Sequence, residues 1–169
     1  AMDFLTQQNR RVSGEQLGEI AEISAKDKHV VVIGGGDTGS DCVGTSFRQG
    51  AATVTQLEIM PKPPEKENKS LTWPDWPMKL RTSTSHDEGA ERDFAITTKK
   101  FTGSHKLVNT LQTIRVDWKK GPNGGMEMME VKGSIENLKA DLVLLAMGFM
   151  HPSHDNVVKN LSVGLDERG

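Results

Sequence analysis

The chain has 169 residues, of which 35% are hydrophobic, so it can bury one core and is not wholly disordered. Its formal net charge of −2 gives no electrostatic reason to expect a nucleic acid or a membrane as partner. A single cysteine, Cys42, excludes an internal disulfide and a cysteine-held iron–sulfur cluster or structural zinc within the chain. No apolar signal segment and no membrane-spanning run is present, and we therefore expect a cytoplasmic protein.

The first element expected is the end of a helix over residues 1–9, where apolar residues occur at loose helical spacing. The chain opens without an initiator methionine, and we interpret it as a piece of a longer protein. Gly14 and Gly18 disfavour a helix in the segment that follows.

The strongest signal is a β-strand, a glycine-rich turn, a helix and a second strand in succession. The β-branched run His29–Ile33 is typical of a strand buried on both faces of a parallel sheet. A helix is expected over Ser40–Gln49 and a second strand over Thr53–Ile59. This order within about 30 residues is a βαβ unit, which predicts an α/β fold.

The rest of the chain changes in character twice. Residues 60–89 hold most of the prolines and little periodicity, which predicts a long loop. Strands are expected over 93–101, 108–118 and 126–135, joined by glycine-containing turns as an antiparallel meander. The apolar run Ala140–Gly148 predicts a further buried strand that returns to the parallel sheet. Together these elements predict a Rossmann-like, three-layer α/β domain with a parallel sheet and an antiparallel meander.

The glycine-rich turn matches the dinucleotide-binding pattern in its proper context, after a strand and before a helix. Gly34 permits the tight turn, Gly36 lets a pyrophosphate approach the backbone, and Gly39 lets the helix pack close to the strand. Free N–H groups and the helix dipole then favour the phosphate charge. Asp37 is expected to cap the helix with its side chain. The expected phosphate loop consists of Gly34, Gly35, Gly36, Asp37, Thr38 and Gly39.

Glu58 lies about 20 residues beyond the glycine motif, at the end of the second strand, where a carboxylate can bind the adenosine ribose hydroxyls. A carboxylate there repels the extra phosphate of NADP, which favours NADH. NADPH stays open, since Lys62 and Lys66 follow closely. The alternative is an ordinary exposed glutamate at a strand end.

Other candidates favour structural interpretations. Cys42 is expected to pack inside the helix face, and no histidine has the spacing of a metal ligand, so we predict no metal site. The segment Trp73–Pro77 is either a docking surface for a partner or a loop that folds onto its own domain. No arrangement of side chains predicts a catalytic residue.

Several motifs, in the order in which they occur along the chain, resemble the small (β) subunit of glutamate synthase. The similarity covers nearly the whole chain. They are Ala1–Arg10, Val30–Gly39, Val54–Pro64, Trp73–Pro77 and Ala140–Phe149. The resemblance implies a pyridine-nucleotide-binding domain inserted into an FAD-binding domain. In this family, hydride passes from NAD(P)H to FAD, and electrons then pass through iron–sulfur clusters to the large subunit. There they support reductive synthesis of glutamate from glutamine and 2-oxoglutarate.

The resemblance also implies how the chain is organised. Residues 1–27 would be a connecting segment, 28–152 the NAD(P)H-binding domain, and 153–169 a segment leading back to the FAD domain. Gly148 would lie near the nicotinamide. Ile59 and Met60 stand where the NADPH-preferring branch has paired arginines, which again favours NADH. The helix expected near residues 85–93 is shortened.

The expected partners are therefore the FAD-binding domain of the same parent chain and the glutamate synthase large subunit. FAD and iron–sulfur clusters would belong to the parent, and the isolated chain is expected to be inactive. One alternative is the NAD(P)-binding domain of another flavin and iron–sulfur oxidoreductase, similar to dihydropyrimidine dehydrogenase or a bifurcating transhydrogenase. A second is a Rossmann module that binds no dinucleotide and serves as a docking platform.

Overall fold

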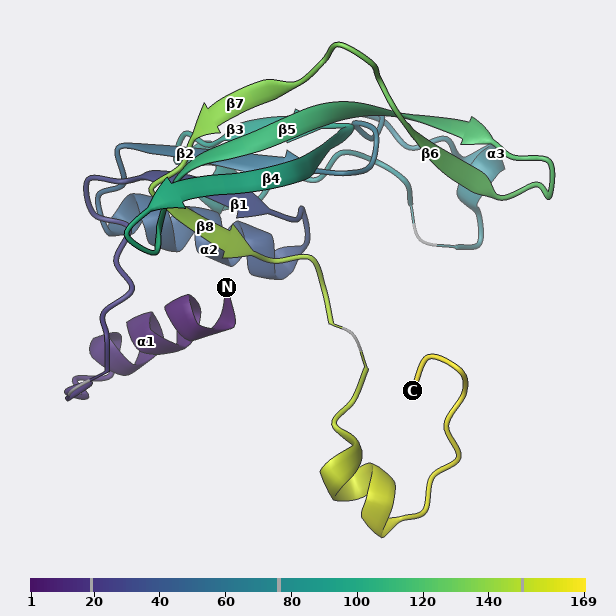
Figure 1. Cartoon of the computed structure of the whole chain (residues 1–169). Coiled ribbons are helices and arrows are strands. Elements are labelled where there is room, and N and C mark those ends of the chain that lie inside the picture. The colour runs from purple at the N-terminus through teal and green to yellow at the C-terminus, as the bar shows by residue number, and fades with distance from the viewer. Residues whose placement is uncertain (19, 76, 150) are drawn as a thin grey trace.

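The structure is a computed structural model that describes residues 1–18, 20–75, 77–149 and 151–169. Two four-stranded sheets and their flanking helices form the body of the molecule (Figure 1). In chain order the elements are α1 (Met2–Val12), β1 (His29–Ile33), α2 (Asp37–Arg48), β2 (Thr53–Glu58), α3 (Lys69–Thr72), α4 (Thr84–Asp87), β3 (Glu91–Phe94), β4 (Ile96–Ser104), β5 (Leu107–Lys120), β6 (Met126–Glu130), β7 (Glu136–Lys139), β8 (Leu142–Leu145) and the helical segment η1 (His154–Val158).

The first sheet is parallel, with the strand order β3-β2-β1-β8. Strand β1 lies in its interior, which explains the unbroken β-branched run found there. The βαβ unit is confirmed, and so is the return of the strand near the C-terminus, as β8, to this sheet. Helix α2 begins at Asp37, three residues before the predicted start, because the glycine turn leads directly into it.

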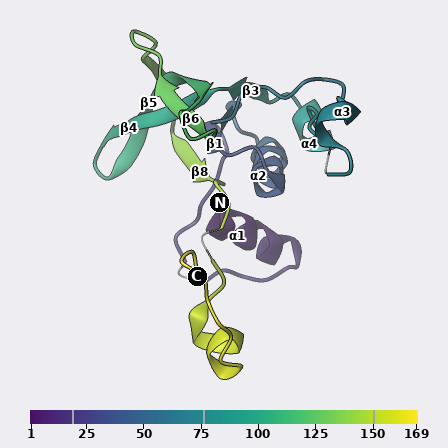
Figure 2. The same cartoon turned by 90° about the vertical axis from the view of Figure 1, so that its right-hand side faces the viewer.

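The second sheet is antiparallel, with the order β4-β5-β6 and with β7 also paired to β5. It covers one face of the parallel sheet and α2 covers the other, which confirms the three-layer α/β fold (Figure 2). Successive residues of β1 point to opposite faces. Val30 and Val32 pack with Cys42 of α2, and Val31 packs with Ile96 and Leu111 of the second sheet.

Two predicted strands of the meander are wrong in their bounds. The strand expected over 93–101 is two strands, because Ala95 adopts a left-handed backbone (φ 52°) and the chain changes sheets there. Its first part, β3, is a parallel edge strand paired with β2. The strand expected over 126–135 ends at Glu130 as β6, and a separate strand, β7, begins at Glu136 and pairs with a different part of β5.

The loop over residues 60–89 contains two four-residue helices, α3 and α4. Helix α4 is the short helix expected near residues 85–93, and its residues contact α2.

Helix α1 confirms the helix expected at the N-terminus and also contacts α2. The segment from η1 to the C-terminus extends away from the sheets (Figure 1). Among the described residues, no helix combines the length and the hydropathy needed to cross a membrane.

Candidate functional site

The glycine turn joins the carboxyl end of β1 to α2, and two of its glycines are required by close backbone packing. Gly34 has a φ of +122°, and a Cβ there would overlap the carbonyl oxygen of Ala146, just beyond β8. A Cβ at Gly39 would overlap the carbonyl oxygen of Gly34. Both positions therefore exclude larger residues for structural reasons, as the pattern predicts for the first and third glycines.

Gly36 differs, because a Cβ at this position would meet no atom within 4 Å. It is the N-cap of α2, and in the described part of the chain no side chain caps this helix. Asp37 is the first helical residue and is exposed, so the prediction that its side chain caps the helix is wrong. Gly35 is also exposed, and Thr38 is half-buried.

The start of α2 therefore has the chemistry that a pyrophosphate requires. The first turn of a helix has backbone N–H groups without helical partners, and its dipole favours an anion. Beside Gly36 the space is open, so a phosphate can approach the backbone. The residues present fit the phosphates of a dinucleotide, although Asp37 adds a negative charge nearby.

Glu58 ends β2 and lies directly against the glycine turn. A Cβ at Gly35 would overlap the carboxylate of Glu58. The fold thus brings together the turn and the residue predicted to bind the ribose, because the carboxyl ends of parallel strands meet at one edge of the sheet. Arg92 of β3 donates a hydrogen bond to Glu58 Oε1 at 2.9 Å, and the two side chains are 15% and 17% exposed.

A buried hydrogen-bond chain supports the turn from behind. Gln56 Nε2 donates to the carbonyl oxygen of Gly34 at 2.9 Å, and Gln56 Oε1 accepts from His86 Nε2 at 2.8 Å. The backbone N–H of Ser83 donates to His86 Nδ1 at 3.0 Å, so the proton of the neutral ring is on Nε2. Burial lowers the pKa of His86, and the positive charge of Arg92 lowers it further.

Sequence reasoning missed Arg92, Gln56 and His86 as parts of this site. Gln56 is fully buried in β2, so an amide side chain inside a strand rich in β-branched residues was the available signal. Arg92 and His86 reach the site through tertiary packing and have no local signal. Gly148 follows β8 at the same edge of the sheet, is exposed and has a φ of +92°, and the cofactor role predicted for it remains a prediction.

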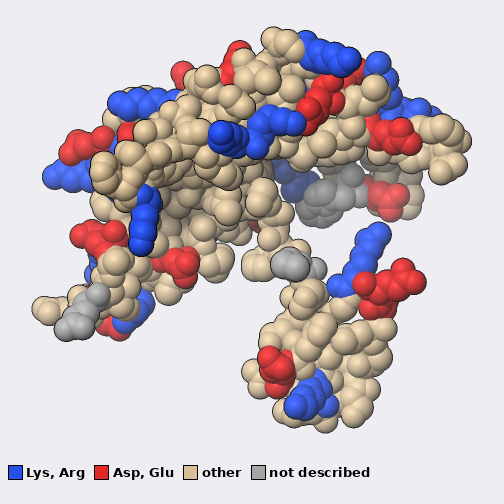
Figure 3. Space-filling model, viewed as in Figure 1, with Lys and Arg blue, Asp and Glu red and all other residues tan. Residues whose placement is uncertain are grey.

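The other predicted features have the following positions. Cys42 is fully buried, which confirms its packing role, and burial raises the pKa of its thiol to about 11. Among the described residues, no group of three His, Cys, Asp or Glu side chains is arranged to hold a metal ion. Figure 3 shows basic and acidic side chains interspersed over the visible face.

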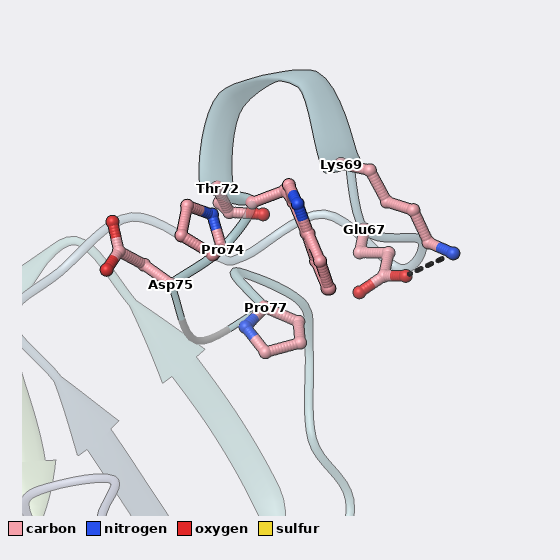
Figure 4. Close-up of a pocket in the computed structure, with 7 residues that line it drawn as sticks. Glu67, Lys69, Thr72, Pro74, Asp75 and Pro77 are labelled. Atoms are coloured by element: carbon pink, nitrogen blue, oxygen red, sulfur yellow. Dashed lines mark ion pairs between the residues drawn. The ribbon is translucent and has the colours of Figure 1, made fainter.

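The loop around Trp73 forms a cavity of about 380 Å³ (Figure 4). Trp73 is 78% exposed and lines it with Pro74, Asp75 and Pro77, and Lys69 pairs with Glu67 at its edge at 3.8 Å. No residue of the glycine turn lines this cavity. Trp76, part of the same predicted motif, lies outside the described residues. Both interpretations of this loop remain predictions.

Comparison with solved structures identifies the fold. The chain is similar to the thioredoxin reductase of T. acidophilum, with a TM-score of 0.52 and 22% identity over 85% of this chain and 38% of that one. It is also similar to Mycobacterium tuberculosis FprA in complex with NADPH, with a TM-score of 0.54 and 12% identity, over 79% of this chain and 41% of that one. At these identities the similarity concerns the fold alone.

Comparison of sequences gives a closer relationship, although no family model matches the chain. It is 45% identical to the glutamate synthase (NADPH) small chain of Mycobacterium tuberculosis, over 100% of this chain and 34% of that protein. It is 39% identical to the glutamate synthase (NADH) of Saccharomyces cerevisiae, over 97% of this chain and 8% of that protein. None of these findings favours the alternative oxidoreductase families. Identity of 45% over its whole length places the chain in the glutamate synthase small-chain family, as a segment that spans 34% of the M. tuberculosis protein.

Proposed function

We propose that this chain is the NAD(P)H-binding domain of a glutamate synthase small subunit. The observation that carries the proposal is the uncapped start of α2 beside the open position of Gly36, with the Glu58 carboxylate against the same turn. Backbone N–H groups at residues 34–39 hold the pyrophosphate, and Glu58 accepts hydrogen bonds from the adenosine ribose. Gly148, at the edge where β8 ends, lies toward the nicotinamide. The domain itself spans residues 28–152, between connecting segments 1–27 and 153–169.

In the parent protein, bound NAD(P)H supplies a hydride to FAD, and electrons then pass through iron–sulfur clusters to the large subunit for synthesis of glutamate from glutamine and 2-oxoglutarate. The described residues of this chain contribute binding and orientation, and no acid–base side chain is assigned to the transfer. The partners are the FAD-binding domain and the large subunit, in the cytoplasm. The names of the relatives support this assignment, since they are glutamate synthases.

NADH is the preferred cofactor in this proposal. The carboxylate of Glu58 suits two free ribose hydroxyls, and NADPH lacks one of them because its 2′-oxygen carries the phosphate. Relatives of both kinds exist, because the M. tuberculosis protein is named for NADPH and the yeast protein for NADH. Cofactor choice must therefore be measured on this chain.

The test is calorimetric titration of the purified chain and of Gly36→Ser with NADH and with NADPH. Serine is a favourable N-cap residue, and a Cβ at Gly36 meets no protein atom within 4 Å, so Gly36→Ser should keep the stability of the fold. It fills the space that the pyrophosphate needs, and we expect dinucleotide affinity to fall at least about tenfold. Gly125→Ser is the matched control, because a Cβ there also meets no atom within 4 Å but lies in the turn between β5 and β6.

The outcomes separate the hypotheses. Binding that Gly36→Ser weakens and Gly125→Ser leaves unchanged supports the proposed site. Binding that both variants leave unchanged places the ligand elsewhere. Absence of binding at millimolar concentration of either dinucleotide favours the docking-platform alternative.

A further inference from the structure

Arg92 is held at the proposed ribose site by contacts from three directions. Its guanidinium donates to Glu58 Oε1 at 2.9 Å and to the carbonyl oxygen of Arg81 at 2.8 Å. It also lies over the ring of Phe94, 5.2 Å from the centroid. Its Nε–H is buried and has no acceptor in the part of the chain that the structure describes. Arg92 is therefore fixed in place, and its Nε–H is a hydrogen-bond donor without an acceptor among the described residues.

The ion pair changes the electrostatics of cofactor choice. An unpaired carboxylate next to the ribose repels a 2′-phosphate strongly, because two like charges at close range interact across a partly buried, low-dielectric site. Here the charge of Glu58 is compensated by Arg92, and both side chains are largely buried. A 2′-phosphate on the adenosine ribose thus meets a neutral pair, whose cation is able to bind it, instead of a lone negative charge.

Arg92 also lines a cavity of about 260 Å³. Lys62, Thr82 and Arg92 contribute two cationic groups and a hydroxyl to its lining, and none of the described residues that line it carries a carboxylate. At about 30 Å³ per water molecule, it has room for a phosphoryl group and several waters. Lys62 is exposed, so its ammonium is free to turn toward an anion in this cavity.

We infer that Arg92, assisted by Lys62, is a specificity-determining residue that binds the 2′-phosphate of NADPH, so that the Glu58 site accepts both dinucleotides. The inference rests on the proposed function and deepens it. With NADH, Glu58 accepts hydrogen bonds from the ribose and stays paired with Arg92. With NADPH, the guanidinium keeps its position and donates hydrogen bonds to the phosphate, as arginine does at other phosphate sites.

The experiment measures dissociation constants of both dinucleotides for the wild-type chain, Arg92→Met and Lys62→Met. We expect Arg92→Met to weaken NADPH binding about 10- to 100-fold, the usual worth of a hydrogen bond to a charged group, and NADH binding by less than about threefold. Lys62→Met should weaken NADPH binding by a smaller factor, and its exposed position leaves folding intact. The control is Arg48→Met, which removes another arginine–glutamate pair, Arg48–Glu88, at the far end of α2.

A second ligand pair removes the nicotinamide from the comparison. Adenosine 2′,5′-bisphosphate should lose affinity in Arg92→Met, and AMP should not. Equal loss of both dinucleotides in Arg92→Met, or unchanged NADPH binding in both Arg92→Met and Lys62→Met, overturns the inference while the proposed function stands. Failure of the wild-type chain to bind either dinucleotide overturns the proposed function and the inference with it.

Discussion

Replacement of Gly34 by alanine tests the geometry of the proposed cofactor turn. The φ of +122° costs an alanine about 1–3 kcal/mol. The Cβ of this alanine overlaps the backbone of Ala146, so the ends of β1 and β8 must separate. This separation costs about 1–3 kcal/mol more. Separation also weakens the bond from Ala146 N–H to the carbonyl oxygen of Ile33, worth about 1 kcal/mol. The sum is about 3–7 kcal/mol, a large part of the stability of an ordinary domain.

Gly50→Ala is the matched control for this substitution. Gly50 also has a positive φ, +83°, but a Cβ there meets no atom within 4 Å, so only the backbone term applies, about 1–2 kcal/mol. Thermal unfolding followed by circular dichroism measures both variants. Each kcal/mol lowers the Tm by roughly 2–4 °C for a chain of this size, so Gly34→Ala should lower it by at least about 6 °C. Equal Tm values for the two variants would refute the assigned overlap with Ala146.

The remaining predictions concern buried groups. Because burial raises the pKa of Cys42 to about 11, its thiol should not react with a thiol reagent at pH 8 until the chain unfolds. Rapid stoichiometric labelling of the native protein would contradict its packing role. Burial lowers the pKa of His86 below its ordinary 6.5, so the unfolded chain binds the proton more readily and the free energy of unfolding falls as pH drops through about 6.5. Urea denaturation at pH 7 and pH 5 should show a smaller loss in His86→Asn than in wild type, and equal losses would remove His86 as the cause. The hydroxyl of Thr113 is buried without a hydrogen-bond partner among the described residues. Thr113→Val should therefore raise the free energy of unfolding by about 1 kcal/mol in the same assay. A less stable variant would mean that the hydroxyl has an unrecognised partner.

The parts of the fold that were predictable are those with a local physical signal. Strand β1 is an unbroken β-branched run, and its burial on both faces is what such a run requires. The glycine turn was predictable because close backbone packing at Gly34 and Gly39 leaves no space for a side chain. Strand β3 was misassigned, since it is a short edge strand of mainly polar residues. Its boundary at Ala95 depends on a left-handed backbone conformation, which an alanine in the sequence does not indicate.

By itself, the sequence determined the βαβ unit, the glycine turn and the position of Glu58 at the end of β2, because each depends on residues that are neighbours along the chain. Only the tertiary structure decided what surrounds that carboxylate. Arg92 comes from 34 residues further along, and it reaches Glu58 because β3 adds to the parallel sheet beside β2. The same packing delivers His86 to Gln56 behind the turn. Charge compensation and buried hydrogen bonds act between side chains close in space, so they depend on strand order and not on spacing along the chain.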